Sequence, residues 1–545
     1  MQSLYFTEEH ELFRQSVRQF VEQEALPHIK QWELNEQIPR SVWLRMGELG
    51  FLGVNHAEEY GGSASDFFYS VVYLEELARC EAAGLGASVS VHQYMATAHI
   101  AAIGSDYLRQ TYLSPAISGE KIGALGITEP GGGGDVAAIR TTAKREGDYY
   151  IVNGSKTFIT NGYYADFITM ACRTNPDPGA GIGGMSLIVI DCNSAGISRS
   201  KLKKMGWHSS DTAELFFDNV RVPVSNLVGE EGMGFYYVMD SFQLERLVAG
   251  ILSVAGAFVA LEWTVKYMHE RKAFGRPIAK FQALRHEIAD ITTQLEAARQ
   301  LTYYTAWLYQ NKQFPVKECS MVKLLTSELA KKASDIFLQC FGGYGFMDEY
   351  PISRMYRDAR VGTIVGGTSQ IMKEIIAKVV IDDHKFSPIY DGKPAAPKTI
   401  APTPTPDKGI PITANQSDTE ADMHNSTNLL NIPPQMNPTT AREILYSLPE
   451  RLKVHKLQAG YETCIHFNIS GDNGGEFTVN IKDGVCTVAD GLNGTAKCVI
   501  TTKDSVYEGV ELGKENPQMA VMMGKIKLTN ISEMMTFTGL FQRLF

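Results

Sequence analysis

The sequence of 545 residues has eight cysteines but no Cys-x-x-Cys pair. Cysteines scattered in this way favour neither a zinc site nor a disulfide framework, and they indicate a reducing compartment. Positive charge is scarce too, because 51 lysines and arginines face 61 aspartates and glutamates, for a formal net charge of −10. An acidic chain is a poor partner for nucleic acid or an anionic membrane surface, so we expect neither.

We also find no targeting or membrane signal in the sequence. The first residues enter a folded pattern at once, which predicts no signal or transit peptide. We find no apolar run of transmembrane length, and the final Gln-Arg-Leu-Phe is no peroxisomal address. These absences predict a soluble cytoplasmic protein, and no metal site is expected.

A chain of this length is too long for one core and predicts several domains. Apolar residues recur at helical spacing in 1–122 and again in 236–385, whereas 123–235 has short β-branched and aromatic stretches between Gly and Pro clusters. Residues 386–436 are rich in proline and polar residues and predict a disordered linker. Residues 437–545 predict a small separate domain of helices and strands.

The stretch from Leu125 to Arg140 contains four consecutive glycines, Gly131 to Gly134, shortly after Thr128. Glycines let the backbone approach a flat or phosphorylated ligand closely, and Thr128 adds a hydroxyl and an amide. A flexible surface turn is the other interpretation, because the run lacks both the Lys-Ser/Thr ending of a P-loop and the spacing of a dinucleotide fingerprint. The glycines alone leave both interpretations open.

A second stretch, Lys156 to Gly162 (Lys-Thr-Phe-Ile-Thr-Asn-Gly), together with the first resembles the flavin-binding middle domain of the acyl-CoA dehydrogenases. The resemblance runs from about Leu4 to about Asp382. It implies an N-terminal helical domain, a middle β-barrel and a C-terminal four-helix bundle, with FAD between barrel and bundle. It also implies oxidation of an acyl-CoA to a trans-2-enoyl-CoA, with electrons passed to an electron-transfer flavoprotein.

The resemblance assigns residues to the cofactor. Phe158 would pack against one face of the flavin ring, and Thr160 would place its hydroxyl near N5. Gln282 would reach the adenosine diphosphate of a neighbouring subunit, which implies a dimer or, as is common in the family, a tetramer. Many members have Trp at Phe158 and Ser at Gly134, so the contact made by that serine is in doubt here. The full predicted set is Leu125, Ile127, Thr128, Gly133, Gly134, Phe158, Ile159, Thr160, Arg271, Gln282, Gln339, Gly342, Gly343, Thr368 and Gln370.

The catalytic base is predicted from a position at which this chain differs from many family members. Many family members carry a glutamate before Gly-Thr in a loop near the end of the bundle, but this chain has Gly366 there. Either the enzyme is inactive or the base comes from elsewhere, and long-chain and isovaleryl members have it on a helix in a Leu-Glu-Arg context. Here that context makes Glu245 the base, unless Glu245 is a solvated charge paired with Arg246 or a neighbour. The predicted substrate contacts are Gly134, Gln243, Arg246, Gly366, whose amide can still donate, and Gly367.

The last domain has its own signals. Asp483-Gly484 between two alternating stretches predicts a hairpin. Gly513 to Asn530 resembles the C-terminal signature of the sterol carrier protein type 2 family, which implies a small α/β lipid-binding domain. Flexible methionines suit an apolar cavity for lipid tails, although an ordinary Met-rich core has the same composition. The methionines in question are Met519, Met522, Met523, Met534 and Met535.

The helix-borne base and the tethered lipid carrier together predict a long-chain or bulky acyl group. Three other functions stay open at this point. The chain could be a lipid-binding or transfer protein with a non-catalytic dehydrogenase scaffold, or a flavin oxidase acting on acyl thioesters. It could also act on acyl groups presented by a carrier protein rather than by CoA.

Overall fold

The structure is a computed structural model that describes residues 3–382, 438–453, 461–512, 520, 525–530, 533–534, 537–538 and 540–541. The chain forms two units, Met1–Lys398 and Thr399–Phe545, and each is treated separately below. The predicted linker 386–436 lies outside the described residues, as do Met519, Met522, Met523 and Met535.

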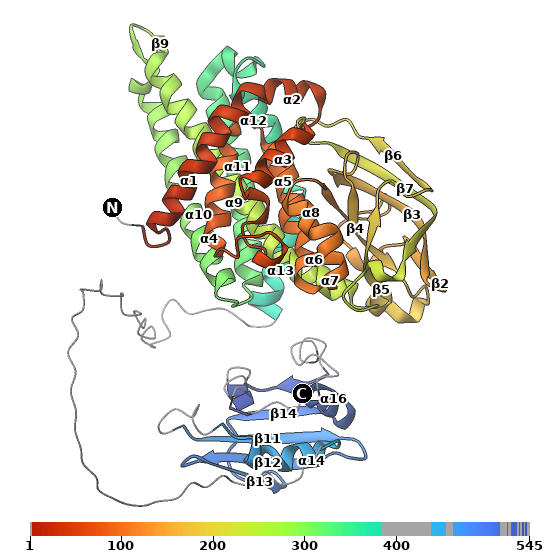
Figure 1. The fold of residues 1–545 in the computed structure, drawn as a ribbon. Coiled ribbons are helices and arrows are strands. Elements are labelled where there is room, and N and C mark those ends of the chain that lie inside the picture. The colour runs from red at the N-terminus through yellow and green to blue at the C-terminus, as the bar shows by residue number, and fades with distance from the viewer. Residues whose placement is uncertain are drawn as a thin grey trace, which may run out of the picture. The chain divides into compact units, whose positions relative to one another are not determined.

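The first unit begins with short helices, shown in red to orange in Figure 1. The buried side chains of α4 and α5 lie on every side of the helix, which is why these two helices run through the interior. Three π turns, η1 (Val21–Ala25), η6 (His92–Ala96) and η7 (Arg109–Leu113), interrupt the helical run. The helices are α1 (Glu8–Phe20), α2 (Ile29–Asn35), α3 (Arg40–Glu48), α4 (Phe67–Leu77), α5 (Ala83–Val91), α6 (Thr97–Ile103), α7 (Asp106–Leu108) and α8 (Ser114–Ile117).

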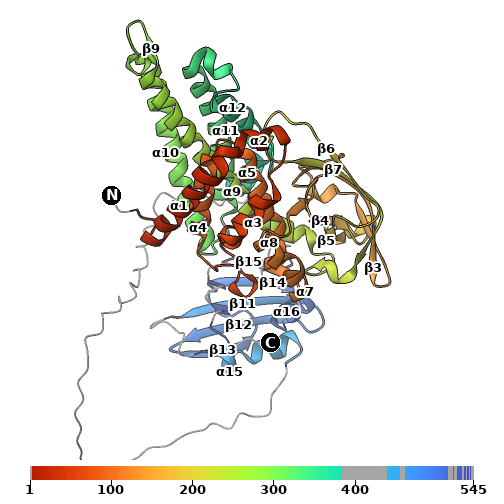
Figure 2. The ribbon, with the colours of Figure 1, turned by 45° about the horizontal axis from the view of Figure 1, so that its top comes forward.

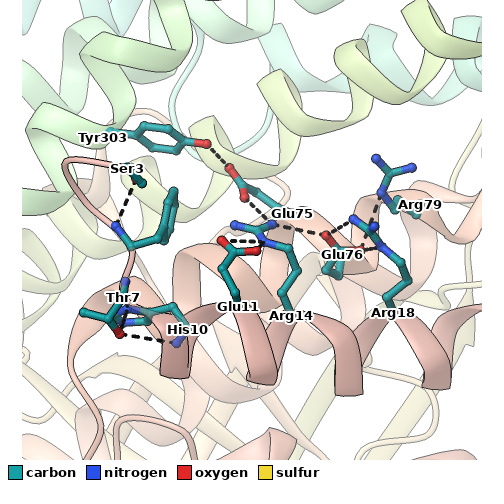
Figure 3. A network of polar contacts seen from close by, with 11 residues as sticks. Ser3, Thr7, His10, Glu11, Arg14, Arg18, Glu75, Glu76, Arg79 and Tyr303 are labelled. Carbon is teal, nitrogen blue, oxygen red and sulfur yellow. Dashed lines mark hydrogen bonds and ion pairs between the residues drawn. The ribbon is translucent and has the colours of Figure 1, made fainter. Parts of the chain in front are cut away.

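A charged network joins α1 to α4 (Figure 3). Arg14 Nη1 lies 2.8 Å from a carboxylate oxygen of Glu75 and 3.1 Å from one of Glu76, and Arg18 adds a contact of 2.8 Å to Glu76. Glu76 is only 2% exposed, so its buried carboxylate is paired with these cations. The hydroxyl of Tyr303 donates to Glu75 and so ties the N-terminal helices to a helix of the C-terminal bundle.

The middle of the unit is an eight-stranded sheet with the order β6-β7-β3-β2-β4-β5-β8, and β1 pairs with β4 in parallel. Its longest pair, β3 with β7, is antiparallel and shifts register between Lys156 and Ile159. Buried side chains from β2 to β7 form a core of their own on one side of the sheet. The strands are β1 (Gly123–Gly126), β2 (Thr142–Glu146), β3 (Tyr149–Thr160), β4 (Phe167–Arg173), β5 (Met185–Asp191), β6 (Ile197–Lys201), β7 (Thr212–Pro223) and β8 (Leu227–Val228).

Three long helices form the rest of the first unit, α9 (Gly234–Glu270), α10 (Gln282–Gln310) and α11 (Val316–Phe341). They pack against one another, and α4 also packs on α9, which places α9 at the centre (Figures 1 and 2). A two-stranded hairpin of β9 (Lys272–Ala273) and β10 (Arg276–Pro277) separates α9 from α10. The shorter α12 (Pro351–Ala359) and α13 (Ser369–Ala377) follow.

The expectation that no apolar run reaches transmembrane length is wrong for α9. By length and composition alone α9 is apolar enough to cross a membrane, with a mean hydropathy of 1.8 over its most apolar window. In the structure 56% of that window is buried inside the protein, against α4, α10 and α11. A helix at the centre of a bundle needs apolar residues all round, which accounts for this composition.

The second unit has a five-stranded sheet with the order β13-β12-β11-β14-β15. Asp483 and Gly484 have φ of 49° and 79° and join β12 to β13, which confirms the predicted hairpin. The buried Phe537, Leu540 and Phe541 belong to the core of this unit, and Met534 packs against it. Its elements are α14 (Ala441–Tyr446), α15 (Leu448–Arg451), β11 (Thr463–Ser470), β12 (Gly475–Lys482), β13 (Val485–Asp490), β14 (Cys498–Lys503), α16 (Asp504–Glu511) and β15 (Lys527–Leu528).

Candidate functional site

A buried ion pair joins the two stretches that the sequence singled out. Lys156 Nζ, fully buried on β3, lies 2.8 Å from Glu129 Oε1 and donates to the carbonyl of Ile127 at 3.0 Å. The backbone amide of Thr157 donates to the carbonyl of Thr128 at 2.9 Å. These contacts hold the end of β3 beside the segment that follows β1.

Glu129 also closes the glycine-rich loop. Its two carboxylate oxygens accept from the amides of Arg140, at 2.6 Å, and Thr141, at 2.9 Å, so the residues before and after the loop meet at one side chain. Burial alone would raise the pKa of Glu129, but Lys156 and the donors from Thr141 outweigh it and lower that pKa. The loop is therefore fixed at its base by a charged group, while Gly131 to Gly134 beyond it are exposed.

Phe158 and its neighbours present an unusual surface at the end of β3. Phe158 has a φ of 59° and an exposed fraction of 70%, at the point where the β3–β7 register shifts. A bulky residue in the left-handed region costs about 1–3 kcal/mol, and such strain gathers at functional sites. Asn161, with a φ of 64°, holds the turn after Thr160 by donating to the carbonyls of Ser88 and Gly123.

These residues fit a flat aromatic cofactor such as the flavin that the resemblance implies. A ring held out in the open at a strained position offers a face for stacking. Next to it the glycine loop offers backbone without side chains, and a Cβ added to Gly131 or Gly132 would meet nothing within 4 Å. Ile127 and Ile159 are buried just behind, and Leu125 is partly buried in β1.

Glu245 lies on α9 with an exposed fraction of 7%, and its Oε1 has no hydrogen-bond partner in the described part of the chain. Burial raises the pKa of Glu245 to about 8, while the charge of Arg246 lowers it. Because it is buried, Glu245 is no solvated helix charge. A carboxylate with a free oxygen and a pKa near neutrality has the properties of a general base.

Arg246 and Gln243 stand beside it on α9. The Nη1 of Arg246 donates to Gln243 Oε1 at 3.3 Å, and the Gln243 amide donates to the carbonyl of Met239 at 3.1 Å. The guanidinium also lies over the ring of Phe242, 5.6 Å from its centroid. Arg246 is therefore held by its own helix and leaves the carboxylate of Glu245 free.

Lys323, only 1% exposed on α11, donates to the carbonyl of Gly367. Burial lowers the pKa of Lys323 to about 8, the charge of Arg246 lowers it further, and Glu328 raises it. Gly366 and Gly367 have φ of 64° and 91°, so the backbone turns sharply here, and a Cβ on Gly366 would meet open space. The lysine thus anchors a loop that has open space beside Gly366.

The same loop leads into α13 and reaches the glycine-rich loop. Thr368 caps α13 by accepting from the amide of Ile371 at 3.3 Å. Ser369 donates to Glu328 on α11 at 2.7 Å, which fixes the first turn. A Cβ added to Gly134 would lie 3.5 Å from Ile371 Cδ1. The structure therefore brings Gly133, Gly134, Gly366, Gly367, Thr368 and Gln370 to one side of the molecule.

The remaining predicted cofactor residues gather elsewhere. Arg271, Gln339, Gly342 and Gly343 line a cavity of about 500 Å³ between the end of α9 and the end of α11, and no residue around Glu245 lines it. Gln282 begins α10 nearby without lining the cavity. A separate cavity with an arginine and glycine backbone can take a phosphorylated group.

The anchoring role of Lys323 can be tested by mutation. We expect Lys323→Met to lower the rate of substrate oxidation at saturation about tenfold to a hundredfold with little change in substrate affinity, because the loop loses its anchor. Lys323→Arg should keep part of the rate, and Lys331→Met, which removes an exposed lysine of the same helix, should change nothing. A wild-type rate in Lys323→Met would contradict the anchoring role.

Two structural features were not predicted from the sequence. The Lys156–Glu129 pair lies within the two motifs, but a contact between residues 27 positions apart leaves no local signal. Lys323 sits in an amphipathic helix where a lysine suggests solvent rather than burial. In the part of the chain that the structure describes, no group of His, Cys, Asp and Glu could hold a metal ion, and all eight cysteines are free.

Comparison with known proteins places both units. Residues 7–120, 124–220 and 232–381 match the N-terminal, middle and C-terminal domain models of acyl-CoA dehydrogenase, and 444–542 match the SCP-2 sterol transfer family. The long-chain specific acyl-CoA dehydrogenase of Sus scrofa mitochondria is 38% identical over 69% of this chain and 88% of its own length. An acyl-CoA dehydrogenase of Bacillus subtilis is 37% identical over 69% of this chain and 99% of its own length.

The solved structures agree. The crystal structure of an acyl-CoA dehydrogenase from Geobacillus kaustophilus is 43% identical with a TM-score of 0.68, over 70% of this chain and all of that one. Glutaryl-CoA dehydrogenase in complex with glutaryl-CoA is 35% identical with a TM-score of 0.67, over 70% of this chain and 97% of that one. The chain belongs to the acyl-CoA dehydrogenase family and carries a C-terminal domain of the SCP-2 sterol transfer family.

Proposed function

We propose that the protein is an FAD-dependent acyl-CoA dehydrogenase that converts a long-chain or bulky acyl-CoA to the trans-2-enoyl-CoA, with Glu245 as the base. The observation that carries the proposal is the buried carboxylate of Glu245, whose Oε1 has no partner among the residues that the structure describes and whose pKa is raised to about 8 by burial. Long-chain specific dehydrogenases of Sus scrofa and Mus musculus, 38% and 39% identical, support the choice of chain length.

The reaction asks three things of the chain. An α-C–H bond of a thioester is a very weak acid in water, so a dry site with a placed base is needed. Glu245 takes the pro-R α-proton onto a carboxylate oxygen, and the amide of Gly366 donates to the thioester oxygen as it gains negative charge. FAD held by the predicted cofactor residues would supply an acceptor for the hydrogen that leaves the β-carbon with its electron pair.

Other residues of this chain hold the parts in place. Lys156 and Glu129 fix the segments that carry Thr128, Phe158 and Thr160 beside the cofactor. Lys323 fixes the Gly366–Gly367 loop, while Gly134 leaves room between that loop and the cofactor. The cavity at Arg271 is suited to the adenosine diphosphate of a neighbouring subunit's FAD, so we propose a dimer or tetramer.

The second unit extends the proposal. A lipid-carrier domain in the same chain would hold a lipid or acyl-CoA near the dehydrogenase at an effective concentration on the order of millimolar. This arrangement favours poorly soluble, long acyl groups. We further propose that an electron-transfer flavoprotein reoxidises the cofactor and that the protein works in the cytoplasm.

The function is tested by mixing the purified protein anaerobically with hexadecanoyl-CoA and with a shorter acyl-CoA. Bleaching of the visible flavin band and formation of the trans-2-enoyl-CoA are the expected results. Oxygen consumption during aerobic turnover would favour an oxidase. A protein that binds lipid but cannot be loaded with flavin would be a lipid carrier and not a dehydrogenase. If only acyl groups attached to a carrier protein react, the substrate is an acyl carrier protein thioester and not an acyl-CoA.

The pKa of Glu245 sets the expected pH dependence. The base must be ionised, and burial raises its pKa to about 8, so the second-order rate constant of flavin reduction should rise about tenfold per pH unit below pH 8 and then level off. Stopped-flow reduction between pH 6 and pH 9.5 measures this. A profile that is flat from pH 6 upwards would mean that the base ionises at a lower pH.

A further inference from the structure

Gln93 is a buried amide that neither the fold nor the proposed reaction uses. It lies in the π turn η6 with an exposed fraction of 2%, and both its Nε2 and its Oε1 lack a hydrogen-bond partner in the described residues. Leaving a buried donor or acceptor unpaired costs about 1–3 kcal/mol each. Both atoms of one side chain left unpaired in an otherwise packed helix indicate an outside partner.

The packing of α5, η6 and α6 on α9 shows what Gln93 faces. A Cβ added to Gly86 would lie 3.0 Å from Leu252 Cδ2, so Gly86 and Leu252 are neighbours. About four turns further along the chain, Ile100 belongs to the same buried cluster as Val238, so the two helical stretches run in opposite directions. Figure 2 shows α5 beside α9.

The register between these anchors places Gln93 near the level of the base. From position 86 to 93 and from 93 to 100 is seven residues each, and the same step leads from 252 to 245 and from 245 to 238. Seven residues are about two turns of α-helix, so positions 252, 245 and 238 recur on one face of α9, whereas the π turn shifts the face of the other stretch after Gln93. Gly86 beside Leu252 and the packing of η6 on α9 place Gln93 near the level of Glu245, and the π turn makes the helix bulge at this point.

Gln93 and Glu245 do not form a hydrogen bond with each other. Such a bond would relieve both the amide and the free Oε1. Ser241, one turn before Glu245 on α9, has an unpartnered buried Oγ as well. Buried polar atoms of both helices are thus left unpaired near the base, where an acyl chain that reaches Glu245 would lie.

We propose that Gln93 is a specificity-determining residue and that the preferred acyl group carries a hydroxyl a few carbons beyond the reacting bond. The inference rests on the proposed function, since it assumes that an acyl chain reaches Glu245. A hydrocarbon chain would leave both amide atoms unpaired. A hydroxyl donates to Oε1 and accepts from Nε2 at once, so one group satisfies both.

The position of the hydroxyl follows from the register. Gln93 lies near the level of Glu245, and an offset of up to one helical turn, about 5.4 Å, corresponds to about four carbons of an extended chain. A hydroxyl on one of carbons 4 to 7 is therefore within reach of the amide. Sites built to bond a substrate hydroxyl reject the analogue that lacks it far more strongly than apolar pockets reject an added methylene.

The test compares hexadecanoyl-CoA with its 4-, 5-, 6- and 7-hydroxy derivatives on the flavin-loaded protein. Dissociation constants of the corresponding trans-2-enoyl products, measured by calorimetry, give a readout that needs no turnover. Anaerobic flavin reduction gives the rates. We expect at least one hydroxy compound to bind and to react at least tenfold better than the unsubstituted chain.

The variants Gln93→Leu and Gln93→Met keep the volume and remove the amide. Both should reverse the preference, with better use of hexadecanoyl-CoA and at least tenfold weaker binding of the hydroxy product. Gln300→Leu makes the same change on an exposed face of α10 and should leave the ratio as in wild type.

Three outcomes overturn the inference. The first is a wild type with no hydroxy preference at any position, as a bound water satisfying Gln93 would give. The second is a preference that both variants keep. The third is an equal loss for all substrates, which would assign Gln93 to the thioester or the base. If no acyl-CoA bleaches the wild-type flavin, the proposed function itself has failed instead.

Discussion

Replacing Glu245 with glutamine should lower the rate of flavin reduction by acyl-CoA about 10²-fold to 10⁴-fold, the usual contribution of a general base. Glutamine keeps the size of the side chain and its place on α9 but cannot take a proton. Affinity for acyl-CoA should stay within a few-fold of wild type, because Glu245 is not needed to hold the thioester. Stopped-flow spectroscopy under anaerobic conditions measures both quantities.

The thermal stability of Glu245→Gln should increase at high pH, although its activity falls. The folded-state pKa of Glu245, about 8, lies above its ordinary value, so the folded protein prefers the protonated carboxyl. The stability that this preference contributes is present at low pH and is lost as the pH rises towards 8. Glu245→Gln removes the buried charge, so its melting temperature should exceed that of wild type at pH 8 and match it near pH 5.

Two controls make the first prediction sharp. Glu262→Gln changes an exposed glutamate of the same helix, paired with Arg79 at 2.9 Å, and should keep the wild-type rate. Flavin content of the Glu245 variant must equal that of wild type before rates are compared. A Glu245→Gln protein that reduces its flavin within tenfold of the wild-type rate would mean that another group is the base.

The second large effect is expected at Lys156. Lys156→Met leaves Glu129 buried without its cation, and breaking a buried pair in this way costs about 3–5 kcal/mol of unfolding free energy. The same change removes the contact to the carbonyl of Ile127, so the flavin-binding segments should separate. We expect loss of most bound flavin as well as a lower unfolding midpoint in urea.

A matched control exists in the same domain. Lys144 lies 3.2 Å from Glu146 but is 74% exposed, so Lys144→Met should cost less than about 1 kcal/mol and keep the flavin. The double variant Lys156→Met with Glu129→Gln should regain part of the lost stability, since no buried charge is then left alone. Equal stabilities for Lys156→Met and Lys144→Met would show that the pair does not hold the site together.

Some of the site followed from sequence and some did not, for physical reasons. Glu245 could be predicted because Gly366 stands where many family members have the catalytic glutamate, and because Glu245 lies in the Leu-Glu-Arg context of the members that carry the base on a helix. The Asp483-Gly484 turn was predictable because its left-handed backbone favours those residues locally. Local chemistry of this kind needs no knowledge of what lies far away in the chain.

Long-range contacts were beyond reach. Lys323 meets Gly367 across 44 positions, and a lysine in a helix gives no hint that it is buried. In the sequence Gln93 could not be told from any other helical glutamine. The role proposed for it depends on the packing of two helices that are far apart in sequence. The apolar composition of α9 likewise has two explanations, a bundle centre or a membrane span, and packing shows the first.

The most direct test of the account follows the α-proton itself. Hexadecanoyl-CoA is incubated in D₂O with flavin-loaded wild type and with Glu245→Gln, and the deuterium gained at the α-carbon of the recovered thioester is measured by mass spectrometry. We predict exchange with wild type and none above the uncatalysed rate with Glu245→Gln, at equal substrate occupancy. Exchange by Glu245→Gln at the wild-type rate would show that Glu245 is not the base.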